Sequence, residues 1–138
     1  MIVILIESFK GLRNLTSIIS QNNVTAAGLG LEDLFSEMIQ EKEDTPELTK
    51  FIKLEFISKV KSFGIPTIDS ISLEFHEFPI LQQHVQKTKE MGFDAMFSIH
   101  PKQIGVIQER LTLSRDKIEW AEKVVQLVDA HKSTDMLK

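Results

Sequence analysis

The sequence lacks the features that mark several common classes of protein. It has no cysteine, which excludes a disulfide framework and thiolate metal ligands. Its formal net charge is -4, so it has no broad basic surface to attract the phosphates of a nucleic acid. Its opening apolar run, Ile2–Ile6, lacks a basic flank and is far shorter than the roughly 20 residues of a membrane span. We therefore expect a cytoplasmic protein without nucleic acid or membrane partners.

The composition is that of an ordinary globular domain. Hydrophobic residues make up 42% and charged residues 26% of the 138 positions, which is enough apolar material for one core. No linker, low-complexity segment or clear internal repeat interrupts the chain. The sequence therefore predicts one domain over residues 1–130 and a frayed tail over residues 131–138.

Two hydrophobic spacings alternate along the chain. Short continuous apolar runs, typical of strands covered on both faces, alternate with segments of helical periodicity. The predicted strands lie near residues 2–6, 24–29, 65–75 and 94–100, and the predicted helices near residues 9–21, 31–40, 47–63, 78–92, 102–111 and 117–132. No hairpin signal joins two strands, so an α/β fold with parallel strands is expected. About four βα units amount to half of a (β/α)₈ barrel, and a small open doubly wound sheet is the alternative.

Polar residues follow every predicted strand. They are Glu7 after the first strand, Glu32 and Asp33 after the second, Asp69 after the third, and Ser98, His100 and Lys102 after the fourth. The carboxyl ends of parallel strands meet at one edge of a sheet, where the loops face a common crevice. This edge is therefore the predicted location of a functional site.

Glu7 and Asp33 form the pair that most suggests a metal site. Two carboxylates from adjacent strand ends suit one hard divalent cation such as Mg²⁺ and leave positions for water and substrate oxygens. Acids at the start of helices are also common as caps and as partners of the helix dipole. The residue pattern alone leaves both explanations open.

Other residues near the strand ends also have two explanations each. Gly28 and Gly30 either let backbone N–H groups approach a substrate carboxylate or form a tight turn. His100 is an acid, base or ligand, or it hydrogen-bonds neighbouring loops. Asp69 positions substrate or pairs with a nearby cation. Trp120, in the last predicted helix, is expected to pack against the wall of the barrel.

Four segments, in this order and at these distances, give a more specific indication. They are LIESFKGLRNL, GLGLEDL, GIPTIDSISLEF and GFDAMFSIHPKQIGVI. Together they resemble the citrate lyase beta-subunit family, which includes malyl-coenzyme A lyases and hydroxy-acid aldolases acting on pyruvate. The resemblance runs from Ile2 to about Val125 and implies the C-terminal half of a TIM (β/α)₈ barrel.

The resemblance also implies an activity and roles for particular residues. It implies a Mg²⁺-dependent carbon–carbon lyase that cleaves a citryl- or malyl-type thioester, on coenzyme A or an acyl carrier, to an oxo-acid and an acyl thioester. Glu7 of the LIE motif and Asp33 of the GxEDL motif match the family's metal ligands. Substrate binding is implied for the other matching positions, which are Gly30, Leu31, Glu32, Asp69 and His100.

Departures from the family pattern concern substrate contacts and completeness. Ser70 replaces the usual glycine of the third motif, and the segment after Asp33 is acidic and free of glycine. The family's first four strands, which bring an arginine for the substrate carboxylate, have no counterpart here. We therefore expect a complementing N-terminal half-barrel chain or a homo-oligomer. The alternatives are a truncated, non-catalytic remnant that self-associates and a fragment of a longer gene product.

Overall fold

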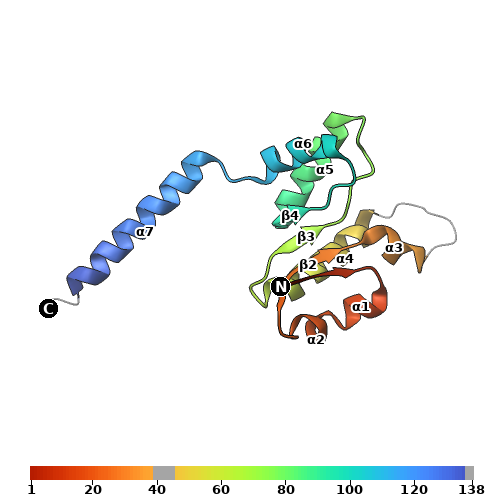
Figure 1. Ribbon diagram of the computed structural model, residues 1–138, viewed down its shortest axis with the longest axis horizontal. Helices are drawn as coiled ribbons and strands as arrows, with labels where there is room; N and C mark the ends of the chain where they lie inside the picture. Colours follow the sequence, from red (N-terminus) through yellow and green to blue (C-terminus); the bar gives the residue numbers. More distant parts are fainter. Residues whose placement is uncertain (39–45, 136–138) are drawn as a thin grey trace.

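The computed structural model describes residues 1–38 and 46–135, the last six of these as helical backbone only. Its elements, in chain order, are β1 (Ile2–Ile6), α1 (Phe9–Arg13), α2 (Leu15–Ile19), β2 (Val24–Leu29), α3 (Leu31–Ser36), α4 (Pro46–Lys61), β3 (Thr67–Asp69), α5 (Phe78–Met91), β4 (Ala95–Met96), α6 (Pro101–Leu111) and α7 (Arg115–Asp135). Figure 1 shows a body built from β1 to α6 and a long helix, α7, that extends away from it.

The four strands form one parallel sheet in the order β1-β2-β3-β4. Each strand pairs with the next along the chain, with Ile6 opposite Leu29 and Asp69 opposite Met96. A doubly wound sheet would reverse its strand order at a switch point, whereas this order is that of a barrel segment. The predicted α/β fold with four parallel strands is therefore confirmed, and all four carboxyl ends lie at one edge.

The helices cover the sheet with two separate apolar clusters. The larger cluster joins α1 to α4 with β1 and β2, and its most buried members include Leu15, Leu29, Leu34, Ile52 and Phe56. The smaller cluster joins α5 to α6 through Leu81, Val85 and Ile107. Since burial of apolar surface is the main stabilising term, each cluster fixes its own group of helices on the sheet.

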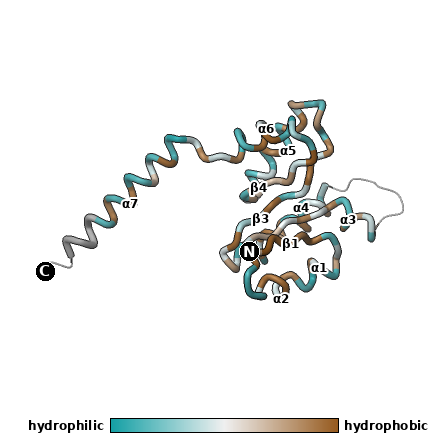
Figure 2. The backbone as a smooth tube through the Cα atoms, viewed as in Figure 1, coloured by the Kyte–Doolittle hydropathy of each residue, from teal (hydrophilic) through white to brown (hydrophobic). Residues whose placement is uncertain are grey.

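The opposite face of β1 is largely uncovered. Val3 and Leu5 are 51% and 46% exposed, although they belong to a strand whose other face is packed against helices. Figure 2 shows β1, with the sequence IVILI, as a hydrophobic stretch of the backbone tube. A parallel strand of this composition is normally buried on both faces, so this surface is suited to contact with further protein.

Several element boundaries differ from the sequence prediction. The third strand ends at Asp69 rather than near residue 75, because the Asp69 carboxylate accepts the Ser70 N–H (2.8 Å) that would continue the ladder. The first helix is divided at Asn14, which ends α1 and begins α2. The last helix continues to Asp135, past the predicted start of the tail at residue 131. Residues 39–45, which include the end of the helix predicted near residues 31–40 and most of its connection to the next predicted helix, lie outside the described residues.

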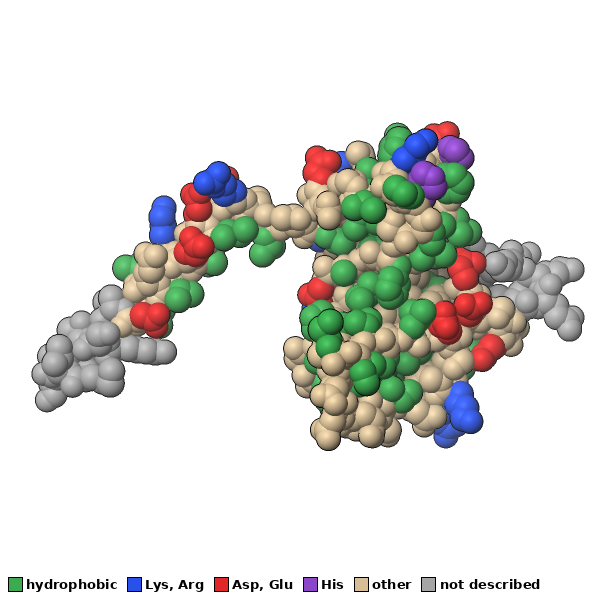
Figure 3. Space-filling model, in the orientation of Figure 1, with side chains coloured by type: hydrophobic (Ala, Val, Ile, Leu, Met, Phe, Trp, Pro, Cys, Tyr) green, Lys and Arg blue, Asp and Glu red, His purple; other side chains and the backbone are tan. Residues whose placement is uncertain are grey.

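Trp120 does not pack against the body, and this prediction is wrong. Its side chain is 68% exposed, and Val125 and Leu127 on the same helix are 59% and 67% exposed. Figure 3 shows hydrophobic side chains along α7 with no contact to the body. The amphipathic pattern correctly predicts a helix, but the pattern does not specify which surface the apolar face contacts. None of the described helices is long and apolar enough to cross a membrane.

Asp94 joins the amino ends of β3 and β4. Its carboxylate accepts hydrogen bonds from the Thr67 N–H (2.8 Å), the Thr67 hydroxyl (3.0 Å) and Lys61 Nζ (2.6 Å). Burial by itself would raise the pKa of Asp94, but the hydrogen bonds from Lys61 and Thr67 and the charge of Lys61 outweigh this effect and lower the pKa below its ordinary value. The ionised form is therefore favoured by folding.

The lowered pKa of Asp94 predicts acid-sensitive stability. Its contribution is fully present above the unfolded-state pKa of about 3.9 and is lost as the pH falls through the lower folded-state pKa. We expect Asp94→Asn to lower the free energy of unfolding at pH 7. The difference in free energy of unfolding between the natural chain and the variant should shrink below about pH 4. Urea denaturation between pH 3 and 7 measures it, with Asp116→Asn on α7 as the exposed control. A difference that is independent of pH would contradict the assignment.

Candidate metal and substrate site

Glu7 and Gly30 lie side by side at the carboxyl ends of β1 and β2. The Gly30 N–H donates to the carbonyl of Ile6 at 2.8 Å, which continues the pairing of the two strands to this point. A Cβ atom at Gly30 would lie 2.7 Å from Cγ and 3.1 Å from Oε1 of Glu7. Such contacts are too short for a methyl group, so the glycine makes the space in which the Glu7 carboxylate lies.

Asp33 lies in the first turn of α3, which begins directly after Gly30. Asp33 and its neighbour Glu32 are exposed, whereas Leu31 is 7% exposed and anchors the helix in the larger apolar cluster. Short loops on paired strands therefore place Glu7 beside the segment that carries Asp33. Negative charge in this turn also stabilises the helix, because its first N–H groups point toward the helix start.

The donor set of this corner suits Mg²⁺. Two carboxylates are hard oxygen ligands, and the cradle at Gly30 leaves the Glu7 carboxylate unobstructed by a side chain. No group of three or more histidine, cysteine or acidic side chains able to hold a metal occurs among the residues that the structure describes. A cation held by Glu7 and Asp33 would therefore complete its coordination with water and substrate oxygens, as Mg²⁺ commonly does.

Asp69 lies on the helix side of the sheet and is fully buried. Its Oδ2 accepts from Lys53 Nζ of α4 at 2.8 Å and from the Thr88 hydroxyl of α5 at 2.6 Å, and its Oδ1 accepts the Ser70 N–H. Lys53 also lies 5.7 Å from the centre of the Phe93 ring. Both carboxylate oxygens thus have protein partners, and the residue ties two helices to the end of β3.

His100 is the N-cap of α6. Its Nδ1 accepts the Lys102 N–H at 3.2 Å, and its ring stacks on that of Phe75, with 5.1 Å between the centroids. The structure therefore uses one ring nitrogen for capping and places the ring between the loops that follow β3 and β4. Sequence inspection alone overlooks Gln103, which completes this cap and is fully buried. Its signal is the glutamine three residues after a capping residue.

Phe97 is a second residue that the sequence prediction misses. A Cβ atom at Gly28 would lie 2.5 Å from Cε2 of Phe97 and 3.3 Å from Cδ1 of Leu5. Phe97, after β4, therefore reaches across the inner face of the sheet to β2. Gly28 is required there because of this close approach, and the ring forms an apolar floor two residue pairs below Glu7 and Gly30, on the same face of the sheet.

The larger cavity lies between α4 and α5. It has a volume of about 900 Å³, and three of the predicted site residues, Leu31, Glu32 and Asp69, line it together with Lys53 and His84. Glu7, Asp33, Gly30 and His100 are not among its lining residues. The structure thus places the predicted residues in three locations: the cleft on the helix side, the corner of Glu7, Gly30 and the turn that carries Asp33, and the start of α6, where His100 lies.

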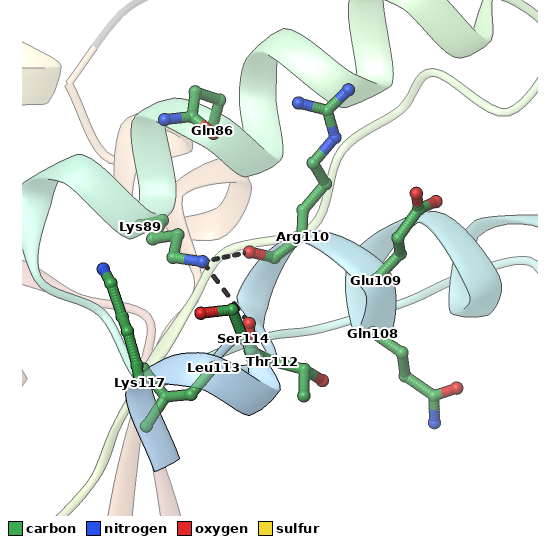
Figure 4. Close-up of a pocket in the computed structure, with 9 residues that line it drawn as sticks. All are labelled: Gln86, Lys89, Gln108, Glu109, Arg110, Thr112, Leu113, Ser114 and Lys117. Atoms are coloured by element: carbon green, nitrogen blue, oxygen red, sulfur yellow. Dashed lines mark hydrogen bonds between the residues drawn. The ribbon is translucent and has the colours of Figure 1, made fainter. Parts of the chain in front are cut away.

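A smaller cavity of about 580 Å³ lies where α5, α6 and α7 meet (Figure 4). Lys89 projects from α5 to the end of α6, where its Nζ donates to the carbonyls of Arg110 (2.6 Å) and Thr112 (3.5 Å). A lysine at this position satisfies carbonyl groups that have no partner within the helix. None of the predicted site residues lines this cavity, and its geometry is that of a helix C-cap.

Comparison with known proteins establishes the family. The sequence model described as HpcH/HpaI aldolase/citrate lyase matches residues 1–101 of the chain. The chain belongs to this family. The match includes Glu7, Asp33, Asp69 and His100, so all the sequence motifs discussed above lie within or reach into the matched region. The predicted family resemblance is confirmed.

Two kinds of relative support this family membership. Mouse mitochondrial citramalyl-CoA lyase is 26% identical over 136 residues, covering 91% of this chain. The citrate lyase beta-like protein of Mycobacterium tuberculosis is 22% identical over 129 residues. Among solved structures, RipC from Yersinia pestis has a TM-score of 0.76 and 26% identity, covering 84% of this chain and 54% of its own. The CitE protein of M. tuberculosis in complex with magnesium, acetoacetate and coenzyme A has a TM-score of 0.71.

These relatives are longer than this chain. The match covers 40% of the mouse enzyme and 47% of the mycobacterial protein. The CitE chain is 21% identical to this chain, and the match covers 91% of this chain and 49% of the CitE chain. At this level of identity the likeness supports the fold alone. Such neighbours have TIM-barrel-like folds, so the described sheet corresponds to about half of such a barrel.

Proposed function

We propose that this chain is the metal-binding half of a Mg²⁺-dependent carbon–carbon lyase of the citrate lyase beta-subunit type. Its substrate class is a citryl- or malyl-type thioester, cleaved to an oxo-acid and an acyl thioester of coenzyme A or an acyl carrier. The observation that supports this most directly is the corner at β1 and β2, where Gly30 leaves room for Glu7 next to the turn that carries Asp33. Relatives described as citramalyl-CoA lyase and a CitE structure containing magnesium and coenzyme A support the same class.

In this proposal, Glu7 and Asp33 hold the cation, and neither needs to move a proton. Bound Mg²⁺ supplies a positive charge that stabilises enolate-like charge as the carbon–carbon bond breaks. Backbone N–H groups of the first turn of α3, from Leu31 through Glu32 to Asp33, orient a substrate carboxylate, since N–H groups in a first helical turn have no acceptor within the helix. The Gly30 N–H itself donates to the Ile6 carbonyl, so Gly30 contributes space rather than a donor. Phe97 excludes water beneath the reacting group, and His100 borders the mouth from the opposite end of the sheet.

Asp69 has a different place in the proposal. Because its carboxylate already accepts from Lys53, Thr88 and Ser70, we assign it to holding the carboxyl end of β3 rather than to direct contact with substrate. A group whose acceptors are satisfied by buried donors would lose those bonds on turning to a ligand. Substrate binding by Asp69 therefore stays an untested sequence prediction.

Partner chains are needed in this proposal to cover the uncovered sheet face. β1 and β4 are the edges of the described sheet, and Val3 and Leu5 on the uncovered face are each about half exposed. A complementing N-terminal half-barrel chain would bury this face and pair with both edges, as strands do in closed barrels. The same surface also favours the second candidate, a non-catalytic remnant that buries it by self-association. A cytoplasmic location stays a prediction, and the mouse relative is mitochondrial by name.

Magnesium binding is the direct test of the proposed site. We expect the chain to bind Mg²⁺ and Asp33→Asn to weaken that binding by at least about tenfold, because a neutral amide replaces one of two charged ligands. Isothermal titration with MgCl₂ measures the affinity, and Asp116→Asn on α7 is the matched control. Equal affinity of the natural chain and Asp33→Asn would refute the metal assignment.

A further inference from the structure

Gln103 connects the two loops that follow β3 and β4. It lies on α6, and none of its surface is exposed. Its Nε2 donates to the backbone carbonyls of Ser72 (2.8 Å) and Glu74 (2.9 Å), in the loop after β3. Its Oε1 accepts from the N–H groups of Ile99 (3.0 Å) and His100 (3.3 Å) and from the Ser98 hydroxyl (3.2 Å), in the loop after β4. One amide thus holds both loops.

Capping α6 does not account for this number of bonds. A capping box needs only one bond from the N-cap N–H to the side chain of the third helical residue. Here the bonds to Ser72, Glu74 and Ile99 lie outside that box. A fully buried amide with every donor and acceptor used is also costly to disturb, because each orphaned group keeps its desolvation penalty.

The same two loops meet again at the surface. The ring of His100 stacks on Phe75 at 5.1 Å, and the Phe75 ring lies 4.2 Å from that of His76. Ser72 is 4% exposed and its hydroxyl forms a 2.9 Å hydrogen bond with Nδ1 of His84 on α5. We call the loops 70–77 and 97–100 the two-loop wall. Both loops follow carboxyl ends of strands, so the wall stands on the same edge as Glu7 and Gly30.

We propose that Gln103 is a positioning residue that fixes the two-loop wall as the side of the mouth that binds the oxo-acid. This inference rests on the proposed lyase function. Gln103 itself touches no ligand, since its amide is enclosed by backbone groups of the two loops. Its effect is on the loops that carry His100 and Phe75, so it acts on binding of the organic ligand and not on the cation.

The arrangement predicts that a change at Gln103 alters the affinity for the oxo-acid but not the affinity for the metal. Glu7 follows β1 and Asp33 lies in α3, two elements that pack in the larger apolar cluster, whereas α6 packs with α5 in the smaller one. Disturbing Gln103 should therefore leave Mg²⁺ affinity within about twofold, because sites without shared partners are close to additive. Oxaloacetate, used as the probe oxo-acid, should bind at least about tenfold more weakly, since preorganisation of the mouth is lost.

Gln103→Glu tests this with little change of shape. The carboxylate keeps the acceptor side, loses both donors and faces the carbonyls of Ser72 and Glu74, so the wall opens while the cap on α6 stays. Gln108→Glu, at an exposed position of the same helix, is the matched control. Amide hydrogen exchange at Glu74 and Ile99 reports the wall, and titrations with MgCl₂ and with oxaloacetate at saturating MgCl₂ report the two affinities.

The expected result for Gln103→Glu is faster exchange in the wall, unchanged Mg²⁺ affinity and weaker oxaloacetate binding than in Gln108→Glu. Unchanged oxaloacetate affinity in folded Gln103→Glu overturns the inference, and so does a natural chain that binds Mg²⁺ but no oxaloacetate. A natural chain that binds neither contradicts the proposed function and the inference with it. Ser98→Ala, which removes one bond of the set, serves if Gln103→Glu does not fold. For Ser98→Ala, a loss of oxaloacetate affinity of about twofold to fivefold supports the inference. An unchanged oxaloacetate affinity overturns it.

Discussion

Replacing Lys53 with methionine is expected to lower the free energy of unfolding by about 3–5 kcal/mol. The ammonium of Lys53 is the charged partner of Asp69, at 2.8 Å, and the two side chains are 16% and 0% exposed. Methionine fills a similar volume but leaves a buried carboxylate without its counter-charge. Against a total stability of about 5–15 kcal/mol for a typical domain, this loss is large enough to unfold a marginal protein. Urea denaturation at pH 7 measures it.

A matched pair of variants separates the charge effect from the loss of a lysine. Lys50→Met, at an exposed position one turn earlier on α4, should change the free energy of unfolding by less than about 0.5 kcal/mol. The double variant Lys53→Met with Asp69→Asn should be less destabilised than Lys53→Met alone, because no unpaired charge stays buried. A Lys53→Met variant as stable as Lys50→Met would show that Asp69 is satisfied by Thr88 and Ser70 without the cation.

The sequence is sufficient to predict the parallel sheet because its signal is local. Branched apolar runs, helical spacing and the glycines at 64 and 92 follow from backbone preferences within a few residues, and Gly92 indeed ends α5 with φ of 93°. The position of Glu7 beside Gly30 follows from the register of two neighbouring strands. Features of this kind depend on short segments and on strand order alone.

Features that depend on distant partners are not predictable in this way. Asp69 had two explanations in the sequence, and the pairing with Lys53 appears only when α4 packs beside β3. Gln103 has an ordinary capping position in the sequence, yet its donors reach residues 29 and 31 positions away. Trp120 has the spacing of a core residue, but burial requires a surface opposite it. In each case the missing information is which elements become neighbours.

In a reassembled barrel, Glu7→Gln is expected to reduce the rate of thioester cleavage by about 10²- to 10³-fold. The assay mixes this chain with a chain that supplies the first four βα units of a family member, and follows release of the oxo-acid from a citryl- or malyl-type thioester at saturating Mg²⁺. Glutamine keeps the shape of the side chain in the Gly30 cradle but removes its charge, so the proposed site would hold Mg²⁺ weakly and the positive charge that the reaction needs would be lost. The fold is unaffected, since Glu7 is exposed.

Gly30→Ala is the informative companion of Glu7→Gln, because its methyl group would displace the same carboxylate without changing any charge. If both variants lose cleavage while Glu47→Gln on α4 keeps it, position as well as charge of the carboxylate is required. Cleavage that survives Glu7→Gln would remove Glu7 from the metal site. A natural chain that forms a stable complex with the first half-barrel but cleaves no thioester would favour the non-catalytic remnant, since the uncovered sheet face would then serve assembly alone.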